Sequence, residues 1–265
     1  MNTVRILFLG DVVGKGARSI IKEKLPGYIK ENGIFYTVAN VENIVGGSGI
    51  TLKTINEVFA AGVDIATSGD HIWKKKDVLE IIDSLPIVRP LNYGDAALGK
   101  GYIIKEKDGI IIAVVNLIGR VFMQPVDCPF KSVSEVLARI QERTNIIIVD
   151  VHAEATSEKL ALGHYLSGKV SAVIGTHTHI PTADERIISG HTAYITDAGM
   201  CGSCDSILGR VKENVIERFV TNMPVRFNLA DKDLRLQGVI LEIDSDSGKS
   251  LSIQRVEIKQ DTAAK

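Results

Sequence analysis

The chain has 265 residues, of which 45% are hydrophobic and 24% are charged. This balance is typical of a soluble globular protein, and it excludes a disordered chain and a small disulfide-stapled scaffold. The formal net charge is −1, so no overall positive field attracts the protein to nucleic acid or to an anionic membrane surface.

Seven short apolar runs predict buried strands, because they are rich in β-branched residues and are bounded by Gly, Asn or Asp. They cover residues 4–9, 35–41, 63–67, 110–117, 146–151, 171–174 and 192–195. Near the end of the chain, residues 235–243 and 251–258 alternate apolar and polar side chains around a polar turn. This pattern predicts an antiparallel hairpin.

Helical patterns lie between these runs, at residues 17–30, 52–61, 77–84 and 133–143. Thr51 is predicted to cap the second helix, and Ser132 with Glu135 is predicted to form a capping box at the fourth. Alternating strands and helices indicate an α/β layered fold. We expect one domain over residues 1–258 and a frayed polar tail at 259–265.

The sequence also bears on the compartment in which the protein works. No apolar run approaches the roughly 18 residues of a membrane span, and we recognise no signal peptide. Three cysteines are too few for a disulfide framework, which fits a reducing cytoplasm. Cys201 and Cys204 form a C-x-x-C without a second pair, so we interpret them as part of an incidental loop. A homo-oligomer is compatible with the sequence.

Almost every predicted strand ends in a residue that binds metals or transfers protons. In chain order these residues are Asp11, Glu42 with Asn43, Asp70 with His71, His152, and His177 with His179. Ligands of open α/β sheets bind beyond the carboxyl ends of the strands, so we expect these side chains to converge on one rim. The H-x-H pair is expected to point to one side in extended geometry. Carboxylates and imidazoles together hold divalent metals, and two metals with a bridging hydroxide suit phosphoester hydrolysis.

The combined motifs resemble those of the calcineurin-like metallophosphoesterases. They are GDVVG (10–14), VEN (41–43), GDH (69–71), VHAEATSEK (151–159) and GTHTH (175–179). Glu42-Asn43, with the downstream THTHIPTAD, TDAGM and ILG segments, is similar to the YmdB-like bacterial branch of that family over residues 6–258. The resemblance implies a four-layer αββα sandwich with two mixed β-sheets. It also implies a phosphodiesterase for cyclic nucleotides, such as 2′,3′-cyclic nucleoside monophosphates, with two divalent ions, iron or manganese.

The resemblance assigns roles to individual residues. The first metal would be held by Asp11, Glu42 and His179. The second would be held by Glu42, Asp70, His152 and His177, so that Glu42 bridges the two ions. His71 would be the general acid that protonates the leaving alkoxide, and Asn43 would lie close to the metals and the phosphate.

One position departs from the family pattern, which has Gly-Asn-His where this chain has Gly69-Asp70-His71. Asp70 adds a negative charge to a site that must attract an anionic phosphodiester. We expect metal binding to be retained and activity to be reduced. This departure keeps a second interpretation open, that of a metal-bound signalling or RNA-associated regulator that has lost turnover.

The remaining features have other interpretations. A binuclear zinc amidohydrolase is disfavoured because its H-x-H usually comes at the first strand. The glycines at 10–16 lack the spacing of a phosphate-binding loop. We expect Trp73 to pack, Ser157 to cap a helix facing the site, and His164 and His191 to be structural or exposed. Three loop residues, Arg89, Asn92 and Arg120, are either surface groups or substrate contacts.

Overall fold

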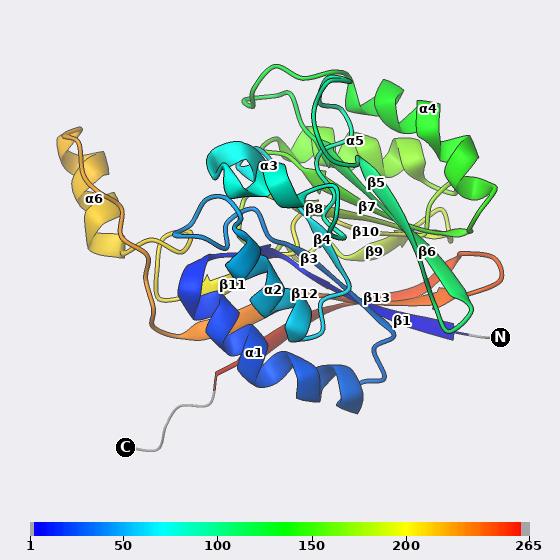
Figure 1. The fold of residues 1–265 in the computed structure, drawn as a ribbon, viewed down its shortest axis with the longest axis horizontal. Coiled ribbons are helices and arrows are strands. Elements are labelled where there is room, and N and C mark those ends of the chain that lie inside the picture. The colour runs from blue at the N-terminus through cyan, green and yellow to red at the C-terminus, as the bar shows by residue number, and fades with distance from the viewer. Residues whose placement is uncertain (1–2, 261–265) are drawn as a thin grey trace.

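The computed structural model describes residues 3–260 and contains two mixed β-sheets packed face to face (Figure 1). The first sheet has the order β2 (Asp11–Val12), β11 (Met200–Ser203), β12 (Leu234–Asp244), β1 (Thr3–Leu9), β3 (Tyr36–Asn40) and β4 (Ile65–Thr67), and β13 (Ser250–Lys259) also pairs with β12. The second has the order β5 (Tyr102–Lys107), β6 (Ile110–Ile118), β7 (Ile146–His152), β8 (Ala172–Thr176), β10 (Thr192–Ile195) and β9 (Arg186–Ile188).

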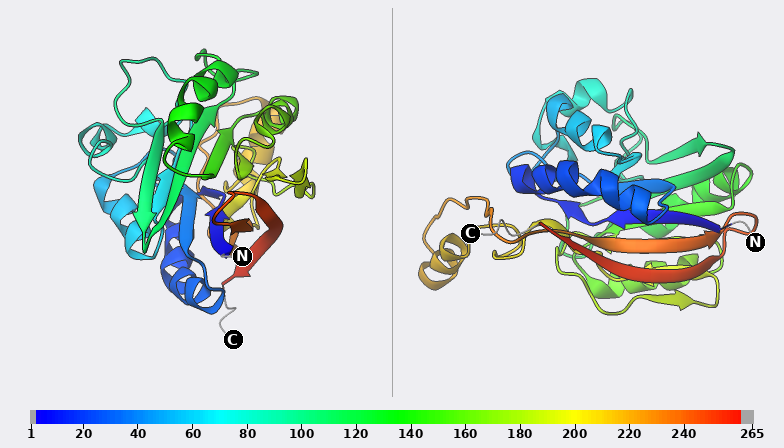
Figure 2. Two further views of the ribbon diagram at one scale, coloured as in Figure 1. Left: turned by 90° about the vertical axis from the view of Figure 1, so that its right-hand side faces the viewer. Right: turned by 90° about the horizontal axis from the view of Figure 1, so that it is seen from below.

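Helices cover the outer faces of both sheets, as the three views show (Figures 1 and 2). The first sheet packs against α1 (Gly14–Glu31), α2 (Leu52–Ala60) and α3 (Asp77–Ile81), and the second packs against α4 (Pro129–Gln141) and α5 (Thr156–Leu166). A short 3₁₀ helix, η1 (Ile72–Lys74), follows β4, and α6 (Lys212–Thr221) stands off the body. The expected four-layer αββα sandwich is therefore confirmed.

The core strands are apolar at nearly every position because each sheet is buried on both faces. In β1, Ile6 and Phe8 point into the core between the sheets, while Leu7 and Leu9 point toward the helices. The same alternation in β7 places Ile148 between the sheets and Val149 against the helix side. This is the two-residue period of a strand, with no polar face to break the run.

Parallel pairing brings the strand ends that carry the predicted site residues to one edge. Leu9 of β1 lies beside Ala39 of β3, and Asn40 of β3 lies beside Thr67 of β4. In the other sheet His152 of β7 lies beside Thr176 of β8. The segments that follow these strands therefore emerge on the same side of the sandwich.

Several local predictions are corrected by the structure. Helix α4 begins at Pro129, so Ser132 lies inside it and forms no capping box; Pro at the first helical turn is a strong start signal. Ala155, not Ser157, occupies the N-cap of α5. Helix α3 ends at Ile81, because the chain turns there instead of continuing to residue 84.

Other boundaries agree more closely with the sequence pattern. Thr51 caps α2 as predicted, with its side chain accepting a hydrogen bond from the Thr54 amide. The predicted C-terminal hairpin is confirmed as β12 and β13, and Lys259 belongs to β13 rather than to a frayed tail. Gln260 also belongs to the body, because its backbone amide donates to the Leu234 carbonyl, and residues 261–265 of the predicted tail lie outside the described residues. Within residues 3–260, every helix is too short or too polar to cross a bilayer.

Candidate metal centre

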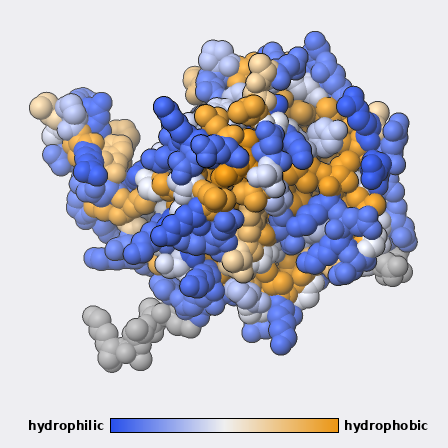
Figure 3. Space-filling view, viewed as in Figure 1, coloured by the Kyte–Doolittle hydropathy of each residue, from blue (hydrophilic) through white to orange (hydrophobic). Residues whose placement is uncertain are grey.

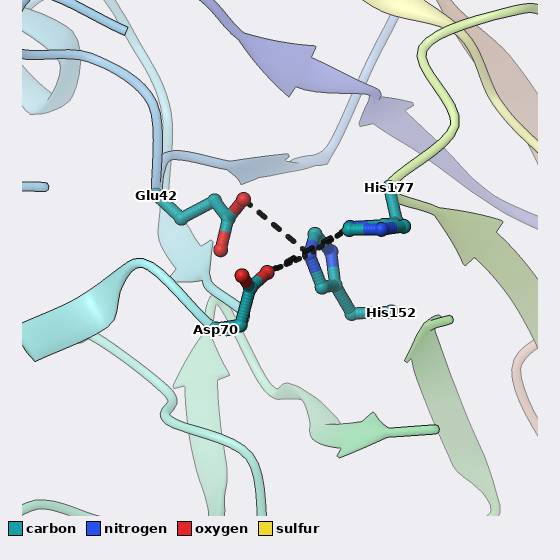
Figure 4. Close-up of side chains that lie close together, drawn as sticks. All are labelled: Glu42, Asp70, His152 and His177. Atoms are coloured by element: carbon teal, nitrogen blue, oxygen red, sulfur yellow. Dashed lines mark hydrogen bonds and ion pairs between the residues drawn. The ribbon is translucent and has the colours of Figure 1, made fainter. Parts of the chain in front are cut away.

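Four of the predicted metal ligands meet at the carboxyl edge of the sheets. One ligand atom from each of Glu42, Asp70, His152 and His177 lies within 4.8 Å of all the others. Figure 4 shows these side chains pointing toward one another from four separate segments. The His152 Nε2 atom is 3.3 Å from Glu42 Oε1, 3.2 Å from Asp70 Oδ1 and 3.0 Å from His177 Nδ1. Two oxygen and two nitrogen donors at these separations are a set that can coordinate a divalent cation.

A second group of predicted ligands lies beside the first. His179 Nε2 is 3.7 Å from Asp11 Oδ1 and 3.4 Å from Asn43 Nδ2, and Asn43 Nδ2 donates to Glu42 Oε1 at 3.0 Å. Asp11 is fully buried, yet its Oδ1 atom has no hydrogen-bond partner among residues 3–260. A buried carboxylate oxygen without a donor is costly, and a bound cation removes that cost. This donor set is therefore also suited to a bound cation.

The expected extended geometry of the H-x-H pair is wrong. Strand β8 ends at Thr176, and both His177 and His179 adopt left-handed backbone conformations, with φ values of 97° and 64°. Such angles are uncommon for residues other than glycine and persist where the surroundings enforce them. Asp197 provides that enforcement, because its Oδ2 accepts hydrogen bonds from the backbone amide and the hydroxyl of the intervening Thr178.

Asp197 is itself held by a buried cation that sequence reasoning missed. Lys159 Nζ lies 2.8 Å from Asp197 Oδ2, and both side chains are fully buried. The other carboxylate oxygen of Asp197 accepts from the Gly199 amide, and the Gly199 carbonyl accepts from the Asp11 amide. One ion pair thus supports both the H-x-H loop and the Asp11 loop. Lys159 is part of the HAEATSEK segment, but its partner is 38 residues away, so spacing gave no signal.

A hydrogen-bond relay fixes which nitrogen of His152 faces the centre. Thr176 Oγ1 donates to Asp150 Oδ1 at 2.7 Å, so it accepts from His152 Nδ1 at 2.9 Å. Asn40 also donates to Asp150, and burial raises the pKa of the Asp150 carboxyl to about 7. With its hydrogen on Nδ1, His152 would offer the lone pair of Nε2 to a cation bound in the cluster with Glu42. Partners of this kind orient metal ligands and set their basicity.

The facing charges shift the pKa values of the cluster strongly. Burial alone would raise the pKa of Glu42, but the imidazoles of His152 and His71 outweigh it and hold that pKa well below its usual value. Burial would likewise lower the pKa of His152, yet the surrounding carboxylates raise it. His177 behaves differently: burial and the neighbouring His152 lower its pKa to about 4. A buried group of mutually compensating charges is typical of a functional site.

His71 lies at the open side of the centre. Its side chain is 32% exposed, and its Nδ1 is 2.8 Å from Asn43 Oδ1. The Asn43 amide is oriented by its own donation to Glu42, so its oxygen accepts and His71 Nδ1 carries the hydrogen. Hydrogen bonding to Glu42 raises the pKa of His71. His71 Nε2 lies 3.6 Å from Asp70 Oδ2, beyond hydrogen-bond distance, so it can exchange a proton with a molecule bound in the cavity that His71 lines.

A cavity of about 650 Å³ opens directly above these residues. Its polar side is formed by Glu42, Asn43, His71, Glu154, His177, Thr178 and His179. Glu154 Oε2 lies 3.2 Å from His177 Nε2, a contact that sequence reasoning did not anticipate although Glu154 follows His152 by two residues. All eight predicted site residues lie together at this place, and all but Asp11 line the cavity or belong to the ligand cluster beneath it.

The remaining sequence candidates have structural surroundings. Arg89 donates to the carbonyls of Pro90 and Leu91, and Asn92 donates to the Ile118 and Asp127 carbonyls, so both brace loops rather than face the cavity. Trp73 packs against Tyr93 with 6.2 Å between ring centroids, as expected. Arg120 is exposed, and its backbone amide is bound by Glu158. His164 is exposed on α5, and His191 is half-buried in a turn beside β10.

The surroundings of the cysteines do not favour a redox role. Cys128, Cys201 and Cys204 are all free thiols. Cys201 is buried in β11, and burial raises its pKa to about 12. A reactive thiol needs a lowered pKa and access to solvent, so the interpretation of the C-x-x-C as incidental agrees with its surroundings.

Comparisons with known proteins extend over almost the whole chain. A family model described as "YmdB-like protein" matches residues 7–256. A Bacillus subtilis protein named 2′,3′-cyclic-nucleotide 2′-phosphodiesterase is 46% identical over 97% of this chain and 98% of its own length.

Two solved structures are similar throughout. A hypothetical protein from Thermus thermophilus superposes with a TM-score of 0.91 at 37% identity, covering 97% of this chain and 100% of that one. A Mycoplasma pneumoniae protein described as a novel phosphatase gives a TM-score of 0.91 at 35% identity, covering 98% and 95%. With its metal-ligand motifs gathered at one edge of the αββα sandwich, the chain belongs to the YmdB-like family of metallophosphoesterases.

Proposed function

We propose that this protein is a metal-dependent phosphodiesterase that hydrolyses cyclic nucleotides, with 2′,3′-cyclic nucleoside monophosphates as its substrates. The observation that carries the proposal is the cluster of Glu42, Asp70, His152 and His177 beneath a cavity that also exposes His71. The name of the Bacillus relative, 46% identical over nearly the full chain, supports this substrate class.

The proposal includes two divalent ions, iron or manganese. Asp11, Glu42 and His179 would hold one, and Glu42, Asp70, His152 and His177 would hold the other. Mixed carboxylate and imidazole donors suit both metals. When bound, the ions polarise the phosphoryl oxygens and lower the pKa of the attacking water. A reducing cytoplasmic location is part of the proposal and fits the three free thiols.

The chain's own residues supply proton transfer and orientation. Hydrolysis adds water to phosphorus, breaks one P–O ester bond and leaves a phosphomonoester, so the departing alkoxide needs a proton. His71 lines the cavity and its Nδ1 is occupied by Asn43, so Nε2 would be the atom that delivers this proton. Asn43 contacts both Glu42 and His71, and thereby couples the position of the acid to that of the bridging carboxylate.

The proposal is tested by a phosphodiesterase assay on 2′,3′-cyclic AMP after reconstitution with Mn²⁺ or Fe²⁺. Turnover that is lost in His71→Ala and Asp11→Ala, but kept in His164→Ala, is the expected result. His164 is the matched control because it is an exposed histidine outside the cavity. Asp70 favours one alternative, a metal-bound regulator without turnover. Cyclic-nucleotide binding without cleavage in excess Mn²⁺ would support that alternative and overturn the proposal.

A further inference from the structure

Residues 205–232 form an excursion between β11 and β12 that carries α6; this segment is called the arm. In Figure 1 and in the right-hand view of Figure 2, α6 projects from the body on the side where β1 and β3 end. Val215 is the buried residue of α6, whereas Ile216, Phe219 and Val220 are 51%, 78% and 77% exposed. Figure 3 shows apolar surface along this projecting segment. Exposed apolar surface of this kind is typical of a binding site rather than of a helix that packs in a core.

The root of the arm is fastened to the loops that carry the metal ligands. The Arg210 guanidinium donates to the carbonyls of Gly46 and Gly47, just after Glu42, and to the carbonyl of Phe227 within the arm. The Leu229 side chain also packs where a Cβ on Gly14 would lie, so only glycine fits at that position after Asp11. These contacts set the arm at the edge of the metal centre.

The arm supplies the apolar side of the cavity above the centre. The lining residues from the arm are Ile207, Leu208, Val215, Phe219 and Phe227, with Arg210 and Arg218 beside them. Val13, which follows the Asp11 loop, completes this apolar side. The remaining lining residues include the polar group of Glu42, Asn43 and the histidines. The cavity therefore has two chemically different sides, one for a charged group and one for a flat apolar group.

We propose that the apolar side of the arm is the subsite for the nucleobase of the substrate, with Phe219 and Phe227 as its specificity-determining residues. This inference rests on the proposed function, because the phosphate must lie at the metal centre for the base to reach the arm. A nucleotide has the same division as the cavity, an anionic phosphate joined to an aromatic base. The cavity is large enough for both, at about 650 Å³.

The chemistry of this subsite also determines its selectivity. Aromatic and aliphatic side chains contact the faces of all four bases alike, because every base has a π-face. The polar side chains on the arm's side of the cavity are Arg210 and Arg218, and Arg210 is already engaged by backbone carbonyls. The subsite thus distinguishes nucleotides from base-free phosphodiesters, while it tolerates purines and pyrimidines.

The test compares two substrates on three variants of the metal-reconstituted protein. The substrates are 2′,3′-cyclic AMP and the base-free 2′,3′-cyclic phosphate of methyl riboside. For Phe219→Ala we expect kcat/KM on the nucleotide to fall about tenfold, mainly through KM, relative to the base-free ester. Phe219→Trp is expected to restore the preference because it keeps an aromatic face. Val220→Ala is the matched control, since Val220 is equally exposed on α6 but does not line the cavity.

The outcomes separate this inference from the proposed function. If the wild-type protein cleaves both substrates with equal efficiency, or if Phe219→Ala lowers both equally, the base subsite is refuted and the phosphodiesterase stands. If the wild-type protein cleaves neither, the proposed function fails, and calorimetric titration with 2′,3′-cyclic AMP decides the subsite. Weaker binding in Phe219→Ala than in Val220→Ala would then support it, and equal binding would overturn it.

Discussion

Replacing Lys159 by Met tests whether the buried ion pair supports the metal-binding loops. The variant keeps the length of the side chain but removes the ammonium group that lies 2.8 Å from Asp197 Oδ2, and it leaves a fully buried carboxylate without its cation. Breaking a buried pair in this way costs about 3–5 kcal/mol. Total unfolding free energies are about 5–15 kcal/mol, so this loss would remove at least about a fifth of the stability.

The loss is measured by chemical denaturation of the metal-free protein and by its melting temperature, which we expect to fall by about 10 °C. Lys131→Met is the control, because Lys131 forms an exposed pair with Glu135 and such pairs contribute about 0–1 kcal/mol. Adding Asp197→Asn to Lys159→Met removes the unpaired charge and keeps an acceptor for Thr178, so it should recover part of the loss. A cost for Lys159→Met no larger than that of Lys131→Met would refute the reasoning.

Three further predictions concern the centre and its surroundings. Asp70→Asn removes one negative charge beside the metals, so we expect metal content to be kept and turnover to rise; unchanged turnover would contradict the electrostatic argument. Thr176→Val breaks the relay that orients His152, and metal affinity, measured by chelator competition, should fall about tenfold to a hundredfold. Burial raises the pKa of the Cys201 thiol from 9.0 to about 12, so at pH 8 iodoacetamide should spare it until denaturant is added, as mass spectrometry can show. Because the unfolded chain loses this proton first, the contribution of Cys201 to the unfolding free energy should decline as the pH rises from about 9 to 12.

Much of the sandwich could be predicted because its strands are buried on both faces. The apolar run of β7 is readable without any partner, since Ile148 and Val149 face different cores but are both apolar. Strand β5 was not predicted because it lies at the edge of its sheet and its second half is the charged run Lys105-Glu106-Lys107, which breaks the apolar pattern. Helix α6 escaped for a related reason, because it packs little of its surface and follows Val211, which is no cap.

The site was predicted to the extent that strand ends determine it. Residues at or just beyond the ends of parallel strands, such as Asp11 after β1 and His152 at the end of β7, are brought together by topology alone. The backbone of His177 could not be predicted, since its left-handed conformation depends on Asp197, which is distant in sequence. The same holds for Lys159, because a buried charge is recognised by its partner and not by its neighbours along the chain.

The sparse packing of α6 has a dynamic consequence. A helix with one buried residue, joined to the sandwich mainly at its root, can unfold locally at little free-energy cost while both sheets stay intact. Backbone amides of residues 212–221 should therefore exchange with deuterium far faster than those of β7. A ligand that fills the cavity would slow that exchange, so entry and departure of the ligand can be governed by the opening of this single helix rather than by motion of the fold.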